Sequence, residues 1–432
     1  MAHTMDTRID HLGEATLRSP IQSNRFINDD QRVLYNVFPE ELLKSIEDGN
    51  APPAFERAGA REQIYFDPKS CRAAIVSCGG LCPGINNVIR SLVMQLYYVY
   101  GVKEILGIRY GYKGLNKKWN IEPVSLTPEI VKGIHTLGGS FLSSSRGSQP
   151  IDSIVDRLEE LKVNILFTIG GDGTLRGGHQ ISQEILKRGL KISVLGIPKT
   201  IDNDISYLAK SFGFETAFSA AVQSIESAHA EAAGAPNGIG LVKLMGRHSG
   251  FIAANAALAF KEVNFVLIPE VDFDLEGDRG LFKVLQQRLD QKSHAVIVVA
   301  EGAGQKYFQE EGNKDPSGNV KLGDIGIYLK NRIKDYFKSI QYEINLKYID
   351  PSYIIRSVRA NPNDTVFCGV LAQNAVHAAM AGKTNMVIGV WNNIFVHVPI
   401  ELVTSKRKQI NPHGSLWQGV LESTGQPGLI NE

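Results

Sequence analysis

Short apolar runs alternate with longer amphipathic stretches from residue 71 onward. The apolar runs at 72–77, 164–169 and 191–197 are typical of strands buried on both faces. The first two are followed directly by glycine-rich segments. Segment 87–99 instead carries its apolar residues at helical spacing. Strands alternating with helices predict an α/β fold with mainly parallel sheets flanked by helices.

The same pattern predicts further elements along the chain. Strands are expected at 102–109, 239–244, 264–269, 295–300 and 385–390, and helices at 215–231 and 281–291. Residues 1–70 lack this alternation and contain only one short amphipathic stretch, 38–46. They are therefore interpreted as an extension that wraps or caps the main body. Ligands in α/β folds bind beyond the carboxyl ends of the strands, so the loops at the strand exits are the informative ones.

Composition and charge exclude several classes of protein. The chain has 432 residues, a formal net charge of +1 and 43% hydrophobic residues, which is ordinary for a soluble globular protein. It has no long basic run, which argues against nucleic-acid binding, and no apolar run near the ~18 residues of a membrane span. The first 30 residues contain no apolar signal-peptide core, and the four cysteines are expected to be reduced thiols. A cytoplasmic protein is expected.

The strongest local signal is the strand exit at residues 164–178. An apolar run ends at Gly170-Gly171-Asp172-Gly173-Thr174, and a helical segment follows to about residue 187. Backbone N–H groups in such a turn face an anion, and Asp172 is a carboxylate that would hold an accompanying metal ion. The same five residues also occur in lipid kinases and NAD kinases. The turn predicts a site for a donor's phosphates, with a purely structural turn as the alternative.

The first strand exit, from Cys78 to Gly84, is also rich in glycine. Glycines allow a backbone to approach a phosphate closely. Alone, this loop is weak evidence, because a tight turn needed only for packing would look the same.

The exit at 197–204 carries two carboxylates, Asp202 and Asp204, spaced two residues apart. One would accept a proton from an attacking hydroxyl while the other helps to hold Mg²⁺. Phosphoryl transfer to an alcohol needs such a base, a metal ion and cations around the moving group. An exposed acidic turn is the alternative interpretation.

Three arginines in loop or strand-exit contexts would supply the cations: Arg146, Arg247 and Arg356. Guanidinium groups bind phosphate oxygens through two parallel hydrogen bonds. A single arginine in such a context is more often an ordinary surface residue, so it is the shared context of all three that favours a functional role.

Taken together and in this order, the motifs resemble those of the phosphofructokinase family. They are Gly-Gly-x-x-Pro-Gly-x-Asn at 79–86, Gly-Gly-Asp-Gly-Thr at 170–174, Pro-Lys-Thr-Ile-Asp-Asn-Asp at 198–204, Met-Gly-Arg-x-x-Gly at 245–250 and Tyr-x-x-Arg at 353–356. The resemblance covers most of the chain between residues 71 and 398. It implies phosphorylation of the 1-hydroxyl of fructose 6-phosphate with Mg²⁺.

The resemblance assigns roles residue by residue. Asp202 matches the family's base, and Thr200 and Asp204 match its neighbours around the transferring phosphate. The nucleotide and metal groups correspond to Gly80, Tyr112, Gly171, Asp172, Gly173, Thr174 and Gly177. Arg146 and Arg247 match cations that stabilise the moving phosphoryl group. The groups that bind the sugar and its 6-phosphate correspond to Met245, Gly246, Arg247, Glu301, Tyr353 and Arg356.

Two positions depart from the pattern of the short bacterial members. Those proteins have arginines, donated by a neighbouring subunit, where this chain has Gly238 and Lys347. Lys347 keeps a positive charge without the fork of a guanidinium group, whereas Gly238 supplies no charge. The sugar-phosphate pocket is therefore less firmly assigned than the catalytic loop.

The phosphoryl donor depends on two further positions. Members of the family that use pyrophosphate carry aspartate at the position of Gly173 and lysine at that of Lys199, and short ATP-using members carry glycine at both. This chain combines glycine with lysine, as do long ATP-using members. A carboxylate at 173 would repel an ATP α-phosphate, so ATP is favoured and pyrophosphate is the alternative. A catalytically silent regulatory subunit is a remote alternative, because Asp172, Asp202 and Asp204 are all present.

The family also implies an organisation. Two Rossmann-like lobes are expected: a nucleotide-binding lobe of residues 71–213 with 355–402, and a sugar-phosphate-binding lobe of 214–354 with 403–432. The expected assembly is a homotetramer, with a dimer as the alternative.

Overall fold

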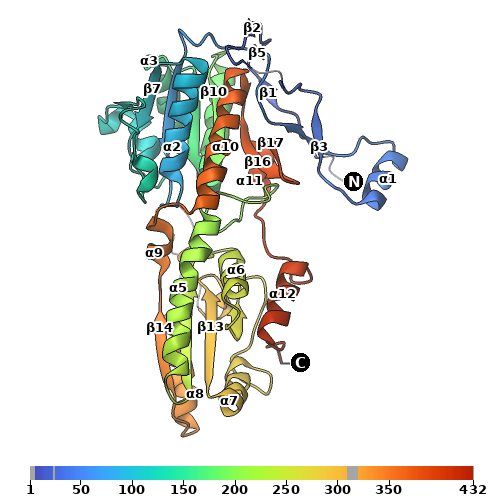
Figure 1. Cartoon of the computed structure of the whole chain (residues 1–432), viewed down its shortest axis with the longest axis vertical. Helices are drawn as coiled ribbons and strands as arrows, with labels where there is room; N and C mark the ends of the chain where they lie inside the picture. Colours follow the sequence, from blue (N-terminus) through green and yellow to red (C-terminus); the bar gives the residue numbers. More distant parts are fainter. Residues whose placement is uncertain (1–4, 23–24, 309–319, 432) are drawn as a thin grey trace. The chain divides into compact units, whose positions relative to one another are not determined.

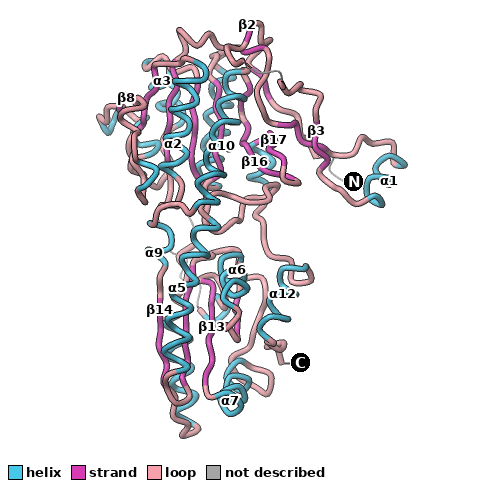
Figure 2. Tube along the Cα trace, in the orientation of Figure 1, coloured by secondary structure: helices cyan, strands magenta, loops and turns pink. Residues whose placement is uncertain are grey.

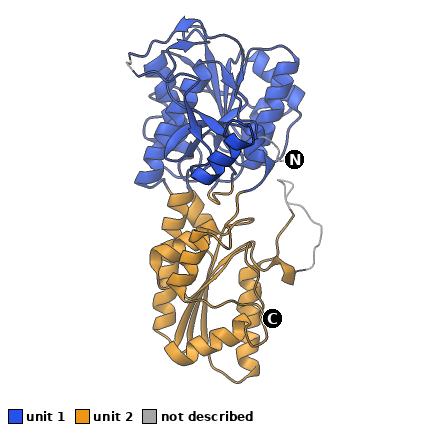
Figure 3. Cartoon of the chain, turned by 90° about the vertical axis from the view of Figure 1, so that its right-hand side faces the viewer, with its two compact units in different colours: residues 1–200, 205–213, 359–407 blue, residues 201–204, 214–358, 408–432 orange. Residues whose placement is uncertain are grey.

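The computed structural model describes residues 5–22, 25–308 and 320–431. The chain divides into two units (Figure 3): unit 1 comprises residues 1–200, 205–213 and 359–407, and unit 2 comprises 201–204, 214–358 and 408–432. These boundaries differ from the expected lobes at 201–204, 355–358 and 403–407. Residues 355–358 belong to unit 2 because they form the last turn and the C-cap of helix α9 (Ser352–Ser357). Helix α11 (Ile400–Ser405) belongs to unit 1 because it packs on α4 (Asp172–Lys187).

Unit 1 is built around a sheet with the strand order β3-β4-β17-β16-β10-β9-β6-β7-β8 (Figure 1). The central strands from β16 to β7 are parallel, and the strands at both ends of the sheet are antiparallel to their neighbours. The strands are β1 Asp10–His11, β2 Leu17–Arg18, β3 Arg32–Leu34, β4 Ala54–Arg57, β5 Gln63–Ile64, β6 Arg72–Ser77, β7 Glu104–Ile108, β8 Val124–Ser125, β9 Ile165–Gly170, β10 Ser193–Pro198, β15 Lys383–Thr384, β16 Met386–Trp391 and β17 Ile394–Pro399.

Helices cover both faces of this sheet. On one face, apolar residues of α3 and α4 pack on β6 and β9 in a buried cluster that includes Leu158, Ile181 and Leu166. On the other face, α2 and α10 lie side by side (Figure 1). The helices of unit 1 are α1 Pro39–Glu47, α2 Ile85–Met94 with a π-helical continuation at Gln95–Tyr100, α3 Ile151–Glu160, α4, α10 Pro362–Met380 and α11. Short 3₁₀ turns lie at Gly111–Leu115, Lys117–Trp119 and Ile134–Thr136.

The first 70 residues continue the fold of unit 1 instead of only covering it. Strands β3 and β4 extend the main sheet beyond β17, β1 pairs with β15, and β2 pairs with β5. The expected short helix is present as α1, and none of its residues is buried.

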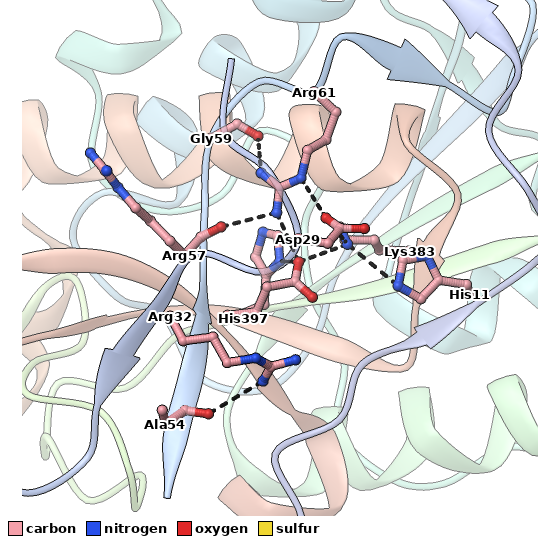
Figure 4. Close-up of polar contacts among 10 residues, drawn as sticks. His11, Asp29, Arg32, Ala54, Arg57, Gly59, Arg61, Lys383 and His397 are labelled. Carbon is pink, nitrogen blue, oxygen red and sulfur yellow. Dashed lines mark hydrogen bonds and ion pairs between the residues drawn. The ribbon is translucent and has the colours of Figure 1, made fainter. Parts of the chain in front are cut away.

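A buried cluster of charges joins this N-terminal extension to the body of unit 1 (Figure 4). Glu56 of β4 accepts hydrogen bonds from Arg61 at 2.8 Å, from Lys383 at 2.7 Å and from His397 Nδ1 at 2.8 Å. Asp29 contacts the same two cations, Arg61 at 2.7 Å and Lys383 at 2.9 Å. Lys383 and His397 are fully buried, and the carboxylates compensate the positive charge of Lys383, which water cannot reach.

Unit 2 contains a parallel sheet with the order β12-β13-β11-β14. Figure 2 shows β13 and β14 of this sheet as magenta strands. Its core on one face comes from α7 and α8, with Phe282 and Phe337 among the fully buried residues, and α5 and α6 pack on the other face. The strands are β11 Gly238–Leu244, β12 Phe265–Leu267, β13 His294–Ala300 and β14 Asn345–Ile349. The helices are α5 Phe214–Ala233, α6 Phe251–Phe260, α7 Leu281–Lys292, α8 Ile325–Ser339, α9 and α12 Ser415–Thr424, with a 3₁₀ turn at Gln305–Tyr307.

The expected α/β architecture is therefore confirmed, with parallel sheets flanked by helices in both units. Within the described residues, no helix combines the length and the apolar character that crossing a membrane requires.

Candidate active site

The turn between β9 and α4 forms the centre of the candidate site in unit 1. All residues of β9 are buried, and α4 begins at Asp172, so Asp172, Gly173 and Thr174 form the first helical turn. The N–H groups at the start of a helix generally lack a partner within the helix, and the helix dipole favours negative charge there. In this turn the Thr174 N–H donates to the Gly171 carbonyl at 2.9 Å. A Cβ on Gly173 would meet no atom within 4 Å. The turn thus offers an open helix N-terminus that suits phosphate oxygens.

Asp172 lies between two cations. Arg176, one helical turn further on, is 3.1 Å from its carboxylate, and Arg407 of the segment after α11 is 3.6 Å away. The Asp172 side chain is partly exposed, so its oxygens remain within reach of a ligand. Mg²⁺ commonly uses one or two carboxylates together with substrate phosphates and water. A single carboxylate beside an anion-binding turn fits that preference.

The loop after β6 is held beside a second loop that carries Arg146. Ser144 Oγ donates to the Gly79 carbonyl at 2.7 Å, and the Gly79 N–H donates to the Ser145 carbonyl at 3.0 Å. Lys199 Nζ donates to the Gly80 carbonyl at 2.7 Å. These bonds bring Gly80, Arg146 and Lys199 together at the carboxyl end of the sheet. The lysine that the sequence singled out therefore contacts the glycine loop directly.

Tyr112 supports the β9–α4 turn from within the core. Its ring is buried, and its hydroxyl donates to the Thr174 carbonyl at 2.8 Å. A Cβ on Gly177 would lie 2.9 Å from the Tyr112 ring, so the glycine is what allows the ring to pack on α4. Burial raises the pKa of the Tyr112 hydroxyl well above its usual value, so it stays protonated as a donor. The structure thus places Tyr112 and Gly177 in contact.

The acidic loop is divided between the two units. Lys199 and Thr200 belong to unit 1, where the Thr200 carbonyl accepts a hydrogen bond from Ser211 Oγ at 2.7 Å. Asp202 and Asp204 belong to unit 2. Asp204 is buried, and so the interpretation of this loop as an ordinary exposed acidic turn does not hold for it.

Within unit 2, the acidic loop is fastened to the loop that carries Arg247. Ser249 Oγ donates to the Asp202 carbonyl at 3.1 Å. The Lys408 N–H donates to the Asp204 carbonyl at 2.8 Å, and Gln409 Nε2 donates to the His248 carbonyl at 3.0 Å. The segment at 408–410 thus ties both loops together.

Glu270 anchors the same segment from the exit of β12. Its carboxylate accepts the Gly250 N–H at 3.0 Å and the Ile410 N–H at 2.9 Å. Burial nevertheless raises the pKa of Glu270 above its usual value.

The exits of β11 and β13 meet in unit 2 and bring together the residues predicted to bind sugar. The Glu301 N–H donates to the Leu244 carbonyl at 2.9 Å, and the Gly302 N–H donates to the Gly246 carbonyl at 3.1 Å. Gly246 has φ +133°, and a Cβ there would lie 2.5 Å from the Ser249 carbonyl oxygen, so only glycine fits. Met245 and Arg247 flank it, and the Arg247 guanidinium donates to the Val320 carbonyl.

Glu301 is the acidic member of this group. Burial raises its pKa above the usual value, although the nearby positive charges of Arg247 and Lys243 act in the opposite direction. A carboxyl group in this position can accept hydrogen bonds from sugar hydroxyls.

Helix α9 presents Tyr353 and Arg356 near the exit of β14. The guanidinium of Arg356 lies 4.6 Å from the centre of the Tyr353 ring, and Tyr353 is 75% exposed. Among the described residues of unit 2, no contact brings Lys347 together with Tyr353 and Arg356. Its ammonium lies 4.0 Å from Glu231, near the carboxyl end of α5, and its strand position pairs with Gly240. Gly238 begins β11, at the amino end of the sheet.

Sequence reasoning missed four residues that organise the site: Lys243, Glu270, Lys408 and Gln409. Lys243 carried a signal, because it is the one charge in the apolar run at 238–244. The other three lie in loops whose partners are far away in the sequence, and no local pattern marks them.

Comparison with known proteins identifies the family. A family model described as phosphofructokinase matches residues 72–379. The chain belongs to the phosphofructokinase family. The family membership expected from the motifs is thereby confirmed.

Full-length relatives within the phosphofructokinase family share about half of their residues with this chain. The ATP-dependent 6-phosphofructokinase of Borreliella burgdorferi is 50% identical over 437 residues, which cover 98% of this chain and 97% of that protein. The ATP-dependent 6-phosphofructokinase of Amycolatopsis methanolica is 47% identical over 444 residues, covering 98% of this chain and 96% of that protein.

Solved phosphofructokinase structures share the fold at much lower identity. A pyrophosphate-dependent phosphofructokinase from Marinobacter aquaeolei superposes with a TM-score of 0.67 at 19% identity, over 84% of this chain and 92% of that chain. Pichia pastoris phosphofructokinase in the T-state gives a TM-score of 0.63 at 20% identity, over 78% of this chain and 35% of that chain. At these identities the likeness concerns the fold alone and does not distinguish the donor.

Proposed function

We propose that this chain is an ATP-dependent 6-phosphofructokinase. It transfers the γ-phosphoryl group of MgATP to the 1-hydroxyl of fructose 6-phosphate and yields fructose 1,6-bisphosphate and ADP, a step of glycolysis. The observation that carries the proposal is the near-full-length identity of about half to proteins named for this activity, in a chain that keeps Asp172, Asp202 and Asp204.

In this proposal, unit 1 binds the donor. The open helix N-terminus at Asp172–Thr174 and the loop at Gly80 face the phosphates, with Gly171 and Gly177 allowing the close packing of the turn. Asp172 would hold Mg²⁺, which would supply positive charge to the phosphates of the donor. Arg146 adds a cation from the neighbouring loop.

Unit 2 binds the acceptor and supplies the base. Glu301, Met245 and Gly246 line the strand exits that face the sugar, and Tyr353 and Arg356 bind its 6-phosphate. Asp202 accepts the proton of the 1-hydroxyl as that oxygen forms its bond to the γ-phosphorus. The bond from the γ-phosphorus to the bridging oxygen breaks, and the electron pair leaves with ADP.

Groups next to Asp202 balance the charge of the transfer. Arg247 stabilises the negative charge on the moving phosphoryl group. Thr200 and Asp204 orient the groups around it, and Lys199 is the cation at the start of the loop.

The base assignment is tested by Asp202→Ser, with Asp202→Asn as a near-isosteric partner. Loss of the proton acceptor is expected to lower kcat by roughly 10²–10⁴-fold and to leave fructose 6-phosphate binding largely intact. Steady-state kinetics and binding by calorimetry measure the two quantities. Rates close to those of the wild-type protein in both variants would rule out Asp202 as the base.

Pyrophosphate is the second candidate donor, because Lys199 matches the lysine of the pyrophosphate-using members. Fructose 1,6-bisphosphate formation should be measured side by side with MgATP and with Mg-pyrophosphate at matched concentrations. ATP is expected to support turnover, with pyrophosphate at least an order of magnitude weaker in kcat/KM. The reverse ranking would overturn the assignment of the donor. Omission of Mg²⁺ should abolish turnover with ATP.

We further propose that the protein acts in the cytoplasm as a homotetramer, with a dimer as the alternative. Lys347 is partly exposed and bound only loosely to Glu231, which suits a residue that reaches a neighbouring subunit's sugar phosphate in place of the family's arginine. Sedimentation velocity of the full chain distinguishes a tetramer from a dimer.

A further inference from the structure

Lys243 is a largely buried lysine close to the residues proposed to bind the sugar phosphate. It lies in β11, two residues before Met245, and its side chain is only 12% exposed. Its ammonium is 2.8 Å from Asp350 Oδ2 and 3.2 Å from Asp324 Oδ2. A charged group at the buried end of an apolar strand is costly unless it is paired. Here both partners are carboxylates.

Each of these carboxylates also fixes the beginning of a helix. Asp324 is the N-cap of α8, and its Oδ1 accepts the Ile327 N–H at 3.1 Å. Asp350 Oδ1 accepts the Ser352 N–H at 3.1 Å and the Ser352 hydroxyl at the start of α9. In both aspartates, one oxygen binds the helix and the other binds Lys243. The lysine therefore links two helix starts to the exit of β11.

The electrostatics keep this link charged. Burial alone would lower the pKa of Lys243, but the two aspartates outweigh it and the pKa is raised above its usual value. The Lys243 ammonium in turn lowers the pKa of Asp350 against the effect of burial. Lys243 and Asp350 are thus both ionised at neutral pH, as a fixed arrangement requires.

We propose that Lys243 is a positioning residue for the sugar-phosphate site, a role that rests on the proposed 6-phosphofructokinase function. By anchoring Asp350, it sets the start of α9 and so the placement of Tyr353 and Arg356 relative to Met245 on the same strand exit. Lys243 itself touches no reacting atom. Its loss weakens recognition of fructose 6-phosphate and leaves the chemical step intact.

The test is Lys243→Met, which keeps the length of the side chain and removes its charge. The KM for fructose 6-phosphate is expected to rise roughly ten- to a hundredfold, because small displacements of binding groups are costly. The kcat should stay within about twofold, and so should the KM for ATP. Lys243→Arg, which restores a cation, should recover at least part of the loss.

Two further variants sharpen the test. Asp350→Asn keeps an oxygen for the Ser352 N–H and removes the charge that Lys243 binds, so it should raise the same KM even where Lys243→Met folds poorly. Lys306→Met is the matched control, because Lys306 also lies between two aspartates, Asp272 at 3.5 Å and Asp274 at 3.4 Å. It should leave all three kinetic constants unchanged.

The outcomes separate the two proposals. An unchanged KM for fructose 6-phosphate in both Lys243→Met and Asp350→Asn would overturn the positioning role, as would a loss confined to kcat. If the wild-type protein forms no fructose 1,6-bisphosphate with either donor, the proposed function itself has failed.

Discussion

Gly170 and Gly173 belong to the same short motif but are glycines for different physical reasons. A Cβ on Gly170 would lie 2.2 Å from Thr174 Oγ1, so that position is closed by the packing of the turn. A Cβ on Gly173 would meet nothing within 4 Å. The sequence predicted a phosphate-binding turn. It could not show that Gly170 is needed for packing and Gly173 for open space, because that difference depends on where the Thr174 side chain lies.

Gly173→Asp is expected to fold normally and to impair the use of ATP more than the use of pyrophosphate. A carboxylate about 4 Å from a phosphate is repelled by ~1–4 kcal/mol, which corresponds to roughly a five- to thousandfold loss in kcat/KM. The comparison is made with both donors in one assay. Gly173→Ala adds a methyl group to open space and serves as the uncharged control. Equal losses with the two donors in Gly173→Asp would contradict the interpretation of this position.

At the scale of elements, buried strands and amphipathic helices could be predicted from the sequence, whereas an edge strand and a helix without a polar face could not. The strands β6, β9 and β13 are continuous apolar runs and lie close to where they were expected. Strand β14 was missed because it is only half-buried along its length. Helix α10 was missed because it is buried on most of its sides and so shows no polar face.

The contact between α4 and Tyr112 gives a prediction at this scale. Gly177→Ala places a Cβ 2.9 Å from the Tyr112 ring and should displace the ring and its hydrogen bond to the Thr174 carbonyl. The KM for ATP is expected to rise several-fold, and unfolding should cost roughly 1–3 kcal/mol less than in the wild-type protein.

A second glycine provides the control. Gly369 lies within α10, where a Cβ would come no closer than 4.0 Å to Ser91 Oγ. Gly369→Ala should instead stabilise the protein by up to about 1 kcal/mol, through helix propensity, and leave the KM for ATP unchanged. Chemical denaturation and steady-state kinetics distinguish the two variants, and equal effects of both would contradict the role of the Tyr112 contact.

At the scale of the whole molecule, the N-terminal extension is part of the fold of unit 1. The sequence predicted a segment that wraps or caps the body, because residues 1–70 lack the βα alternation. The extension instead adds strands to the sheet and is joined through Glu56 to Lys383 and His397. These partners are more than 300 residues apart along the chain, so no local pattern could reveal them.

The buried histidines predict a loss of stability in acid. Burial lowers the pKa of both His377 and His397 to about 4. In the folded state the two imidazole groups therefore bind a proton less readily than in the unfolded state. The free energy of unfolding consequently falls as the pH drops from about 6.5 towards 4. Each histidine is expected to cost roughly 2 kcal/mol of unfolding free energy at pH 5 relative to pH 7.

Thermal unfolding followed by circular dichroism at pH 7 and pH 5 measures this effect. His377→Gln and His397→Gln should each reduce the pH dependence, even where they lower the stability at pH 7. His413 is exposed and provides the control: His413→Gln should leave the change in stability between pH 7 and pH 5 unaltered. If the wild-type protein and both buried-histidine variants lose the same amount of stability between pH 7 and pH 5, other groups control the acid response.

The division of the acidic loop between the two units limits where the protein can be truncated or joined to a relative in a chimaera. The chain passes from one unit to the other after residues 200, 204, 213, 358 and 407. Neither unit corresponds to a single continuous stretch of coding sequence, and the passages closest together enclose Asp202 and Asp204. A fragment that ends before residue 408 would lack the Lys408 N–H that binds the Asp204 carbonyl, and one that begins after residue 200 would lack most strands of the sheet of unit 1. A chimaera of two relatives is therefore expected to remain active only when all the separate stretches that form one unit are taken from the same parent.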